Sequence, residues 1–314
     1  MITLRKRIGA LPFSLANLAV GAQSTTGRPV FVVGNGRSGT SWLGETLGQA
    51  EGVLYYREPC HPHRNGINGT AADGVWCRHV PSGGRDGFFE YTLDAAFRGH
   101  FWRGAGHGLR AYRARIGQRP RIVIKDVASF LSLEWVAARW QPDVVVILRH
   151  PGAYAASVLN LQQDPQELAR LRMLCATDSL RDLLGARLLD PLAAIRDPME
   201  AAVAAWTIRT AVFAKALPRH PDWQVVSYED LAQDPLTGFR ALYDRLGLPW
   251  SDAIAARIRA RTSATDAGAF STARVSHSRI DAWRDQLSPD QARRIRQIVA
   301  PFNLPFYSAS SDWD

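Results

Sequence analysis

The chain has 314 residues, of which 46% are hydrophobic and 21% are charged, the composition of a globular protein with a sizeable core. Its formal net charge of +9 at pH 7 favours anionic partners. The sequence has no RNP motif, no zinc-finger spacing and no long Lys/Arg block, so we expect no nucleic-acid partner. Three widely separated cysteines argue against a disulfide framework and predict reduced thiols and a cytoplasmic location.

Residues 1–28 form a predicted arm ahead of the first strand. A basic cluster at residues 5–7 precedes a mildly apolar stretch from Ile8 to Ala22, which is similar to a weak signal peptide. The stretch is too short to span a bilayer, and no other segment is long and apolar enough to do so. Two interpretations stay open: an arm that packs on the domain, or a peripheral contact with the inner face of a membrane through the basic cluster.

Short apolar segments alternate with helical patterns along the rest of the chain. The predicted strands are 29–33, 53–56, 121–125, 144–148 and 223–228, and the predicted helices include 40–50, 130–140, 235–246, 251–261 and 288–300. A helical tract that ends near Leu217 is expected to break at Pro165, Pro191 and Pro198. This alternation predicts one α/β domain over residues 29–310, with a parallel, P-loop-like sheet and helices on both faces.

Residues 60–118 interrupt this pattern. They contain scattered glycines, histidines, arginines and aromatic residues without a clear period. The segment is too long for a plain loop. We therefore predict an inserted lid that recognises the substrate and contains a helix or two.

The stretch VFVVGNGRSGTSW, residues 31–43, joins a strand to a helix through a glycine-rich loop, the arrangement of a phosphate cradle. Gly34 and Gly39 have the spacing of a Walker loop, but Thr40 stands where that loop has its lysine, and Arg37 is the only cation present. No apolar strand ends in the acidic residue that a Walker-type site uses for Mg²⁺. The loop therefore suits an anion held without metal, by the backbone amides of residues 36–41.

The other predicted strands also end in polar residues. These ends are Glu58, Lys125 with Asp126, Arg149, and Tyr228 with the two acidic residues after it. Ligands of open parallel sheets bind beyond the carboxyl ends of the strands. We expect these side chains and the loop to surround one site.

Four segments resemble the sulfotransferases that use 3′-phosphoadenosine 5′-phosphosulfate (PAPS). GRSGTSWL, residues 36–43, is similar to their 5′-phosphosulfate loop. VVVILRHPGAYAAS, residues 144–157, is similar to their 3′-phosphate element, in which a serine follows the arginine by eight residues. VVSYEDLAQDP (225–235) and SHSRIDAWRDQLS (276–288) resemble two later signatures of the superfamily, and all four keep its order.

The resemblance implies a set of donor-binding residues and the bisphosphate PAP as the released product. The loop would hold the 5′ side, with Arg37 at the bridging oxygen on which charge develops. Arg149 and Ser157 would hold the 3′-phosphate. Trp42 and Tyr228 would lie on the adenine or ribose side, and Ser276 with Arg279 would close the 3′-phosphate pocket. The full implied donor-binding set is Gly36, Arg37, Ser38, Gly39, Thr40, Ser41, Trp42, Arg149, Ser157, Tyr228, Ser276 and Arg279. No metal ion is implied.

The general base is less direct. The cytosolic branch has a K-T-H segment on its third strand, whereas this chain retains Lys125 but has Val127 at the histidine position. Carbohydrate- and tyrosine-directed sulfotransferases place a glutamate near the end of the second strand, which favours Glu58. His61 and His63 compete for the role, and Lys125 would assist the sulfonate oxygens.

The resemblance predicts transfer of a sulfonate group from PAPS to a hydroxyl. A carbohydrate or glycolipid acceptor is favoured because the histidine of the small-phenol branch is missing. Two other classes stay open: an atypical P-loop kinase, and a non-enzymatic protein that binds polyanions or membranes. The abundance of alanine and arginine points to a GC-rich bacterial genome, and no feature indicates an oligomeric state.

Overall fold

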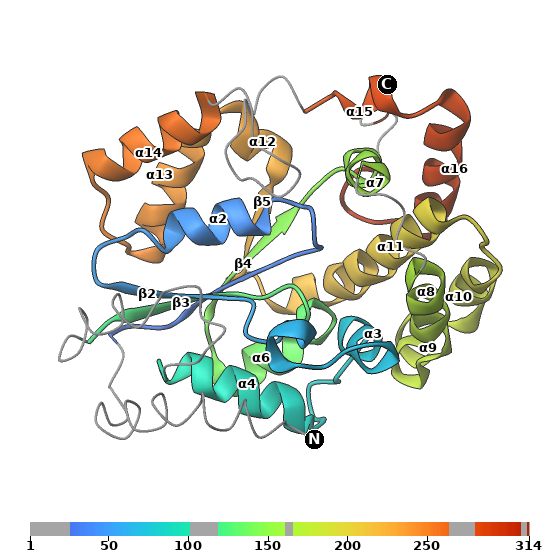
Figure 1. Ribbon diagram of the computed structural model, residues 1–314, viewed down its shortest axis with the longest axis horizontal. Coiled ribbons are helices and arrows are strands. Elements are labelled where there is room, and N and C mark those ends of the chain that lie inside the picture. The colour runs from blue at the N-terminus through green and yellow to red at the C-terminus, as the bar shows by residue number, and fades with distance from the viewer. Residues whose placement is uncertain (1–25, 101–118, 161–165, 264–279, 309–312, 314) are drawn as a thin grey trace.

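The computed structural model describes residues 26–100, 119–160, 166–263, 280–308 and 313. Most of the predicted arm, residues 101–118 of the predicted insertion, and both Ser276 and Arg279 lie outside these ranges. A parallel sheet of five strands, in the order β2–β3–β1–β4–β5, forms the centre of the structure (Figure 1). The strands are β1 (Val30–Val33), β2 (Val53–Arg57), β3 (Arg121–Lys125), β4 (Asp143–Leu148) and β5 (Gln224–Ser227).

The two faces of the sheet carry different helices, because alternate residues of each strand point in opposite directions. Val30 and Val32 belong to one core, which also includes buried residues of the helices above the sheet in Figure 1. Phe31 and Val33 belong to the other core, with the helices drawn below it. The upper helices are α2 (Thr40–Leu47), α13 (Pro235–Leu246) and α14 (Asp252–Ser263), and the lower ones are α4 (Gly87–Phe97) and α6 (Leu133–Trp140). The predicted α/β fold class is thus confirmed.

A third core lies to one side of the sheet and is made of helices. Its central element is α11 (Pro198–Ala216), whose buried face includes Trp206 and Ile208. The helices around it are α7 (Pro151–Leu159), α8 (Gln166–Ala176), α9 (Asp178–Leu184), α10 (Ala186–Ala193), α15 (Trp283–Gln286) and α16 (Pro289–Val299). Within the described ranges, no helix has both the length and the apolar composition needed to cross a membrane.

The proline breaks of the helical tract are only partly as predicted. Pro198 begins α11, and Pro165 lies outside the described residues. The break at Pro191 is wrong, because this proline lies inside α10. The chain changes direction at Gly185 instead, where φ is 89°. A proline is tolerable in so short a helix because it removes a single backbone hydrogen bond, while Leu189 and Leu192 keep their places in the core.

One strand end also differs from its prediction. Tyr228 begins a helix, α12 (Tyr228–Gln233), rather than ending β5. The side chain of Ser227 caps this helix by accepting a hydrogen bond of 3.2 Å from the backbone N–H of Asp230. A serine in this position is a typical N-cap.

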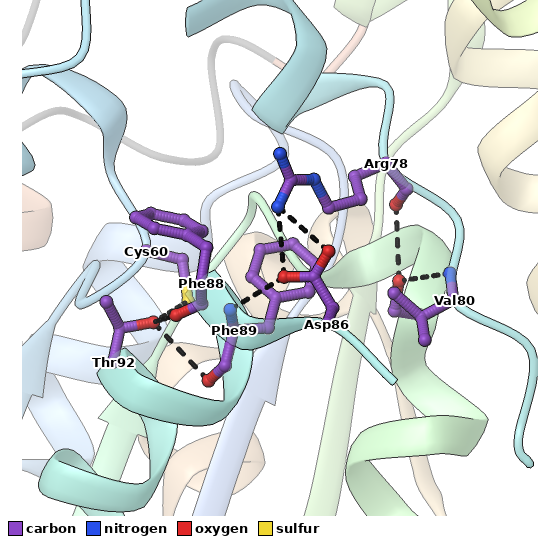
Figure 2. Close-up of polar contacts among 8 residues, drawn as sticks. Cys60, Arg78, Val80, Asp86, Phe88, Phe89 and Thr92 are labelled. Atoms are coloured by element: carbon purple, nitrogen blue, oxygen red, sulfur yellow. Dashed lines mark hydrogen bonds and ion pairs between the residues drawn. The ribbon is translucent and has the colours of Figure 1, made fainter. Parts of the chain in front are cut away.

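The described part of the predicted insertion contains the turn η1 (Pro62–Asn65) and the helices α3 (Thr70–Trp76) and α4. Figure 2 shows polar contacts that hold this part of the insertion together. Asp86 caps α4 by accepting from the N–H of Phe89 at 2.9 Å, and Arg78 donates two hydrogen bonds to the same carboxylate. Thr92 on α4 contacts the buried Sγ of Cys60 at 3.2 Å. The role of the insertion as a lid over a substrate stays a prediction.

Candidate active site

A cavity of about 620 Å³ lies at the carboxyl ends of β1, β2 and β3. The loop after β1 forms one wall, and the residues that follow β2 and β3 form the floor. The turn η1 and the helices α3, α7, α8 and α11 supply the remaining walls. Strands from one half of the sheet and helices from the side layer therefore meet at one concave site.

The loop after β1 has a backbone that requires glycine at two positions. Gly34 has a φ of 155°, and a Cβ there would lie 2.3 Å from the carbonyl oxygen of Ile147. Gly39 has a φ of 89°, and a Cβ there would lie 2.6 Å from the ring of Tyr228. Arg37 has the same left-handed backbone, with a φ of 67°, although it is not a glycine. Such conformations persist only where the surrounding structure holds them, and they concentrate at functional sites.

The loop presents polar groups that suit an anionic ligand. The N-terminus of α2 begins at Thr40 with no side-chain cap and no acidic residue in its first turn. Ser38 is fully buried, and its Oγ has no hydrogen-bond partner among the described residues. The same holds for Oδ1 of Asn35, whose Nδ2 donates to Thr210 on α11 at 3.1 Å. Uncapped helix N–H groups and the Ser38 hydroxyl can donate to a bound phosphate, whereas the Asn35 oxygen only accepts and suits a hydroxyl of the ligand.

Arg37 links the loop to the predicted 3′-phosphate element. Its Nε donates a hydrogen bond of 3.1 Å to Oγ of Ser157 on α7. Arg149 in turn donates from Nη1 to the backbone oxygen of Arg37 at 2.9 Å. The guanidinium of Arg149 stacks over the ring of Tyr228 at 4.6 Å, while its buried Nε has no partner among the described residues. Four of the predicted donor-binding side chains therefore form one contiguous group.

The other predicted donor residues occupy different surroundings. Gly36, Arg37, Thr40 and Ser41 line the cavity, whereas Arg149, Ser157 and Tyr228 lie beside it. Trp42 is 7% exposed and packs edge-on against Phe239 at 5.1 Å, inside the core above the sheet. The proposed contact of Trp42 with a nucleotide stays a prediction.

Glu58 and Lys125 form a buried ion pair where β2 and β3 end. Nζ of Lys125 donates directly to Oε1 of Glu58. The side chain of Lys125 is 2% exposed and that of Glu58 is 15% exposed. Glu58 has a left-handed φ of 52°, and its N–H donates to the backbone oxygen of Lys125 at 2.6 Å. Both side chains line the cavity, as does Arg37, the third predicted catalytic residue.

Burial and charge act in opposite directions on this pair. Burial raises the pKa of Glu58, but the charge and hydrogen bond of Lys125 outweigh it and hold the pKa below the ordinary carboxyl value. Burial lowers the pKa of Lys125, although the Glu58 carboxylate opposes this. Glu58 is therefore ionised at neutral pH and can accept a proton.

The two competing histidines differ in their position relative to the cavity. His61 lines the cavity, with its ring edge-on to Trp76 at 5.3 Å. Burial lowers the pKa of His61, and its Nδ1 has no partner among the described residues. His63 is exposed and hydrogen bonds to Oδ1 of Asn68 at 3.1 Å. His61 therefore remains a candidate base, whereas His63 does not line the cavity, although the two ring centroids are 5.5 Å apart.

Sequence reasoning missed the four polar residues that line the cavity from the helices of the side layer. They are Tyr154 on α7, Glu167 and Arg170 on α8, and Arg209 on α11. Charged residues on helices usually mark a solvated face, so α8 gave no signal. Arg209 did offer one, because it is the only charged residue in the mostly apolar run from residue 201 to 213.

Two further findings concern metal ligands near the site and the family to which the chain belongs. Within the described ranges, no group of three or more His, Cys, Asp or Glu side chains could hold a metal ion. Residues 29–252 match the sulfotransferase family. No curated protein sequence matches the chain significantly.

Two solved structures are similar to the chain at low identity. The sulfotransferase domain from the curacin biosynthetic pathway is 14% identical, with a TM-score of 0.48 over 88% of this chain and 97% of that chain. Mouse sulfotransferase SULT7A1, complexed with PAP, is 16% identical, with a TM-score of 0.40 over 88% of this chain and 85% of that chain. The family match, which spans most of the chain, is the finding that decides identity: the chain belongs to the sulfotransferase family.

Proposed function

We propose that this sulfotransferase takes its sulfonate group from PAPS and transfers it to a hydroxyl of a carbohydrate or glycolipid. The observation that carries the proposal is the joined arrangement of Arg37, Ser157 and Arg149 behind an uncapped helix N-terminus. This arrangement offers one anion-binding site at the helix N-terminus and a second anion-binding site, formed by cationic side chains, next to the first. PAPS carries anionic groups at both its 5′ and 3′ positions, which fits such a pair of sites.

The loop binds the 5′ end of the donor. Backbone N–H groups of residues 36–41 and the hydroxyl of Ser38 hold the 5′-phosphate, and Arg37 reaches the oxygen that bridges phosphorus and sulfur. Arg149 and Ser157 hold the 3′-phosphate, for which an arginine provides two donors in a fixed plane. We also propose that Tyr228, beneath Arg149, contacts the nucleoside.

The reaction is an in-line displacement at sulfur. The acceptor oxygen forms a bond to sulfur, and the bond from sulfur to the bridging oxygen breaks. The electron pair of the broken bond stays on PAP, and Arg37 stabilises the charge that develops there. Glu58 accepts the proton of the acceptor hydroxyl, and Lys125 binds the oxygens of the moving sulfonate.

The acceptor proposal rests on the cavity walls. Trp76 and His61 offer flat faces on which a ring can stack. Glu58 lines the same cavity at the end of β2, so it can receive a proton from a hydroxyl of a bound ring. A carbohydrate or a glycolipid headgroup fits this arrangement.

Turnover of labelled PAPS with a panel of sugars, glycolipids and phenols tests the proposed reaction. We expect Arg37→Ala to lower kcat by about 10²–10³-fold, as loss of one transition-state donor does elsewhere. Arg37→Lys serves as the matched control, because it keeps a cation at the bridging oxygen and should retain most of the activity. Full turnover by Arg37→Ala would contradict the mechanism.

A further inference from the structure

The cavity is more cationic than the proposed donor requires. Two acidic side chains, Glu58 and Glu167, and six basic ones line it. The basic residues are Arg37, Arg57, Arg64, Lys125, Arg170 and Arg209. Our donor contacts use Arg37 and Lys125, which leaves four arginines on the other walls.

Two of these arginines are held at the rim by contacts near β2. Nη1 of Arg57 lies 3.4 Å from Oε1 of Glu45 on α2. Arg64 is exposed and donates a hydrogen bond of 2.8 Å to the backbone oxygen of Arg57. Both side chains reach solvent, so water screens their charges.

Arg170 has a structural task, since it fixes α8 to α3. Its Nε lies 2.8 Å from Oδ1 of Asp73, and its Nη1 lies 2.8 Å from Oε1 of Glu167. Asp73 and Glu167 are the acidic residues of α3 and α8, respectively, so both helices commit their carboxylates to Arg170. Figure 1 shows α3 and α8 side by side at this corner of the molecule.

Arg209 lacks such compensation. It is half-buried on α11, and its Nη2 donates to the backbone oxygen of Trp76 at 3.2 Å. No carboxylate of the described residues forms an ion pair with it. The next residue, Thr210, binds Asn35 of the glycine-rich loop, so this cation stands close to the donor site. A guanidinium withdrawn from water without a counter-ion is unfavourable, and an anionic ligand would offset that cost.

We infer that Arg209 is an anion subsite for the acceptor, so the preferred acceptor carries a carboxylate, sulfate or phosphate group beside its reactive hydroxyl. This inference rests on the proposed function and narrows its acceptor class. Trp76, whose carbonyl holds Arg209, lines the same cavity and can stack on the acceptor ring. The planar guanidinium can then bind the anionic group with two parallel hydrogen bonds.

Binding of matched acceptor analogues to the full chain, saturated with adenosine 3′,5′-bisphosphate, tests this subsite. Ligand-observed NMR compares glucose with glucuronate and glucose 6-phosphate, and 4-hydroxybenzyl alcohol with 4-hydroxybenzoate. We expect each anionic analogue to bind about tenfold tighter than its neutral partner, the gain typical of a charged hydrogen bond. Arg209→Gln should remove this preference, and Arg209→Lys should keep part of it. Arg64→Gln, which removes an exposed cation that lines the same cavity, should leave the preference intact.

Each opposite result overturns the subsite. It fails if no anionic analogue binds tighter than its neutral partner, if Arg209→Gln keeps the preference, or if Arg64→Gln abolishes it. Loss of bisphosphate affinity in Arg209→Gln also overturns it, because Arg209 would then belong to the donor site. If the wild-type chain does not bind the bisphosphate, the proposed donor fails, and the same analogues added to the free chain still decide the subsite.

Discussion

Glu58 and Lys125 hold opposite charges at the floor of the cavity, and each needs the other. Lys125 is nearly inaccessible to water, so its ammonium depends on the Glu58 carboxylate for compensation. Glu58 in turn keeps its charge in a buried place because Lys125 donates to it. A sulfonate bound by Lys125 would compete for this hydrogen bond and raise the pKa of Glu58. Donor binding would therefore make the carboxylate a stronger base.

The pH dependence of kcat/KM distinguishes the two candidate bases. The pKa of Glu58 in the free enzyme lies below the ordinary carboxyl value of about 4.3, so activity should persist as pH falls through 6 and 5 and decline only below that value. Burial lowers the pKa of His61 from its ordinary value near 6.5, so a histidine base would give a decline at a pH below about 6.5, and the variants assign the limb. Glu58→Gln should abolish the acidic limb along with most of kcat. An unchanged profile in that variant, with a limb that disappears in His61→Asn, would reassign the base.

At the scale of elements, the glycine-rich loop and helix α2 are held from behind by their neighbours. Tyr228 at the start of α12 closes against Gly39, and Ile147 at the end of β4 closes against Gly34. The segment around Trp283, which belongs to the last of the sequence signatures, packs closely in a similar way. Its indole stacks on His150 at 4.6 Å, next to Arg149, and a Cβ on Gly152 would lie 2.6 Å from that indole. The separated sequence motifs thus meet around the proposed donor site.

Gly39→Ala tests this close packing. Its Cβ would meet both a positive φ and the ring of Tyr228, so we expect the free energy of unfolding to fall by about 1–3 kcal/mol. Gly36→Ala is the matched control in the same loop, because a Cβ there has no atom within 4 Å. Its unfolding free energy should change by less than about 0.5 kcal/mol. Equal denaturation curves for Gly39→Ala and the wild-type chain would contradict the described loop geometry.

At the scale of the whole molecule, much of the fold could be predicted from the sequence. The five strands are short, apolar and separated by helical patterns, and buried parallel strands require that pattern. The residues at and after the strand ends include Arg37, Glu58 and Lys125, which the sequence predicts as site residues. The structure brings all three to one cavity. This worked because the carboxyl ends of parallel strands share one edge of a sheet, whatever the loops between them do.

The rest depended on tertiary packing that no local pattern encodes. Arg209 reaches the cavity because α11 passes behind the loop, a crossing that only the side layer of helices determines. Trp42 follows the loop directly, yet it packs into the core against Phe239. Residues 60–100 are held by ion pairs between distant positions, such as Arg78 with Asp86 and Asp73 with Arg170. A local charge pattern does not predict such pairs. Propensity and periodicity describe single elements, and these contacts join several.

The measurement that tests the central claim most directly is a calorimetric titration with adenosine 3′,5′-bisphosphate, beside ADP and ATP with Mg²⁺. We expect the bisphosphate to bind without metal and more tightly than ADP, which lacks the 3′-phosphate. Arg149→Ala should weaken its binding at least about tenfold, whereas Arg196→Ala, an exposed arginine at the end of α10, should not. Preference for ATP with Mg²⁺, or full bisphosphate affinity in Arg149→Ala, would contradict the proposed donor and its binding site.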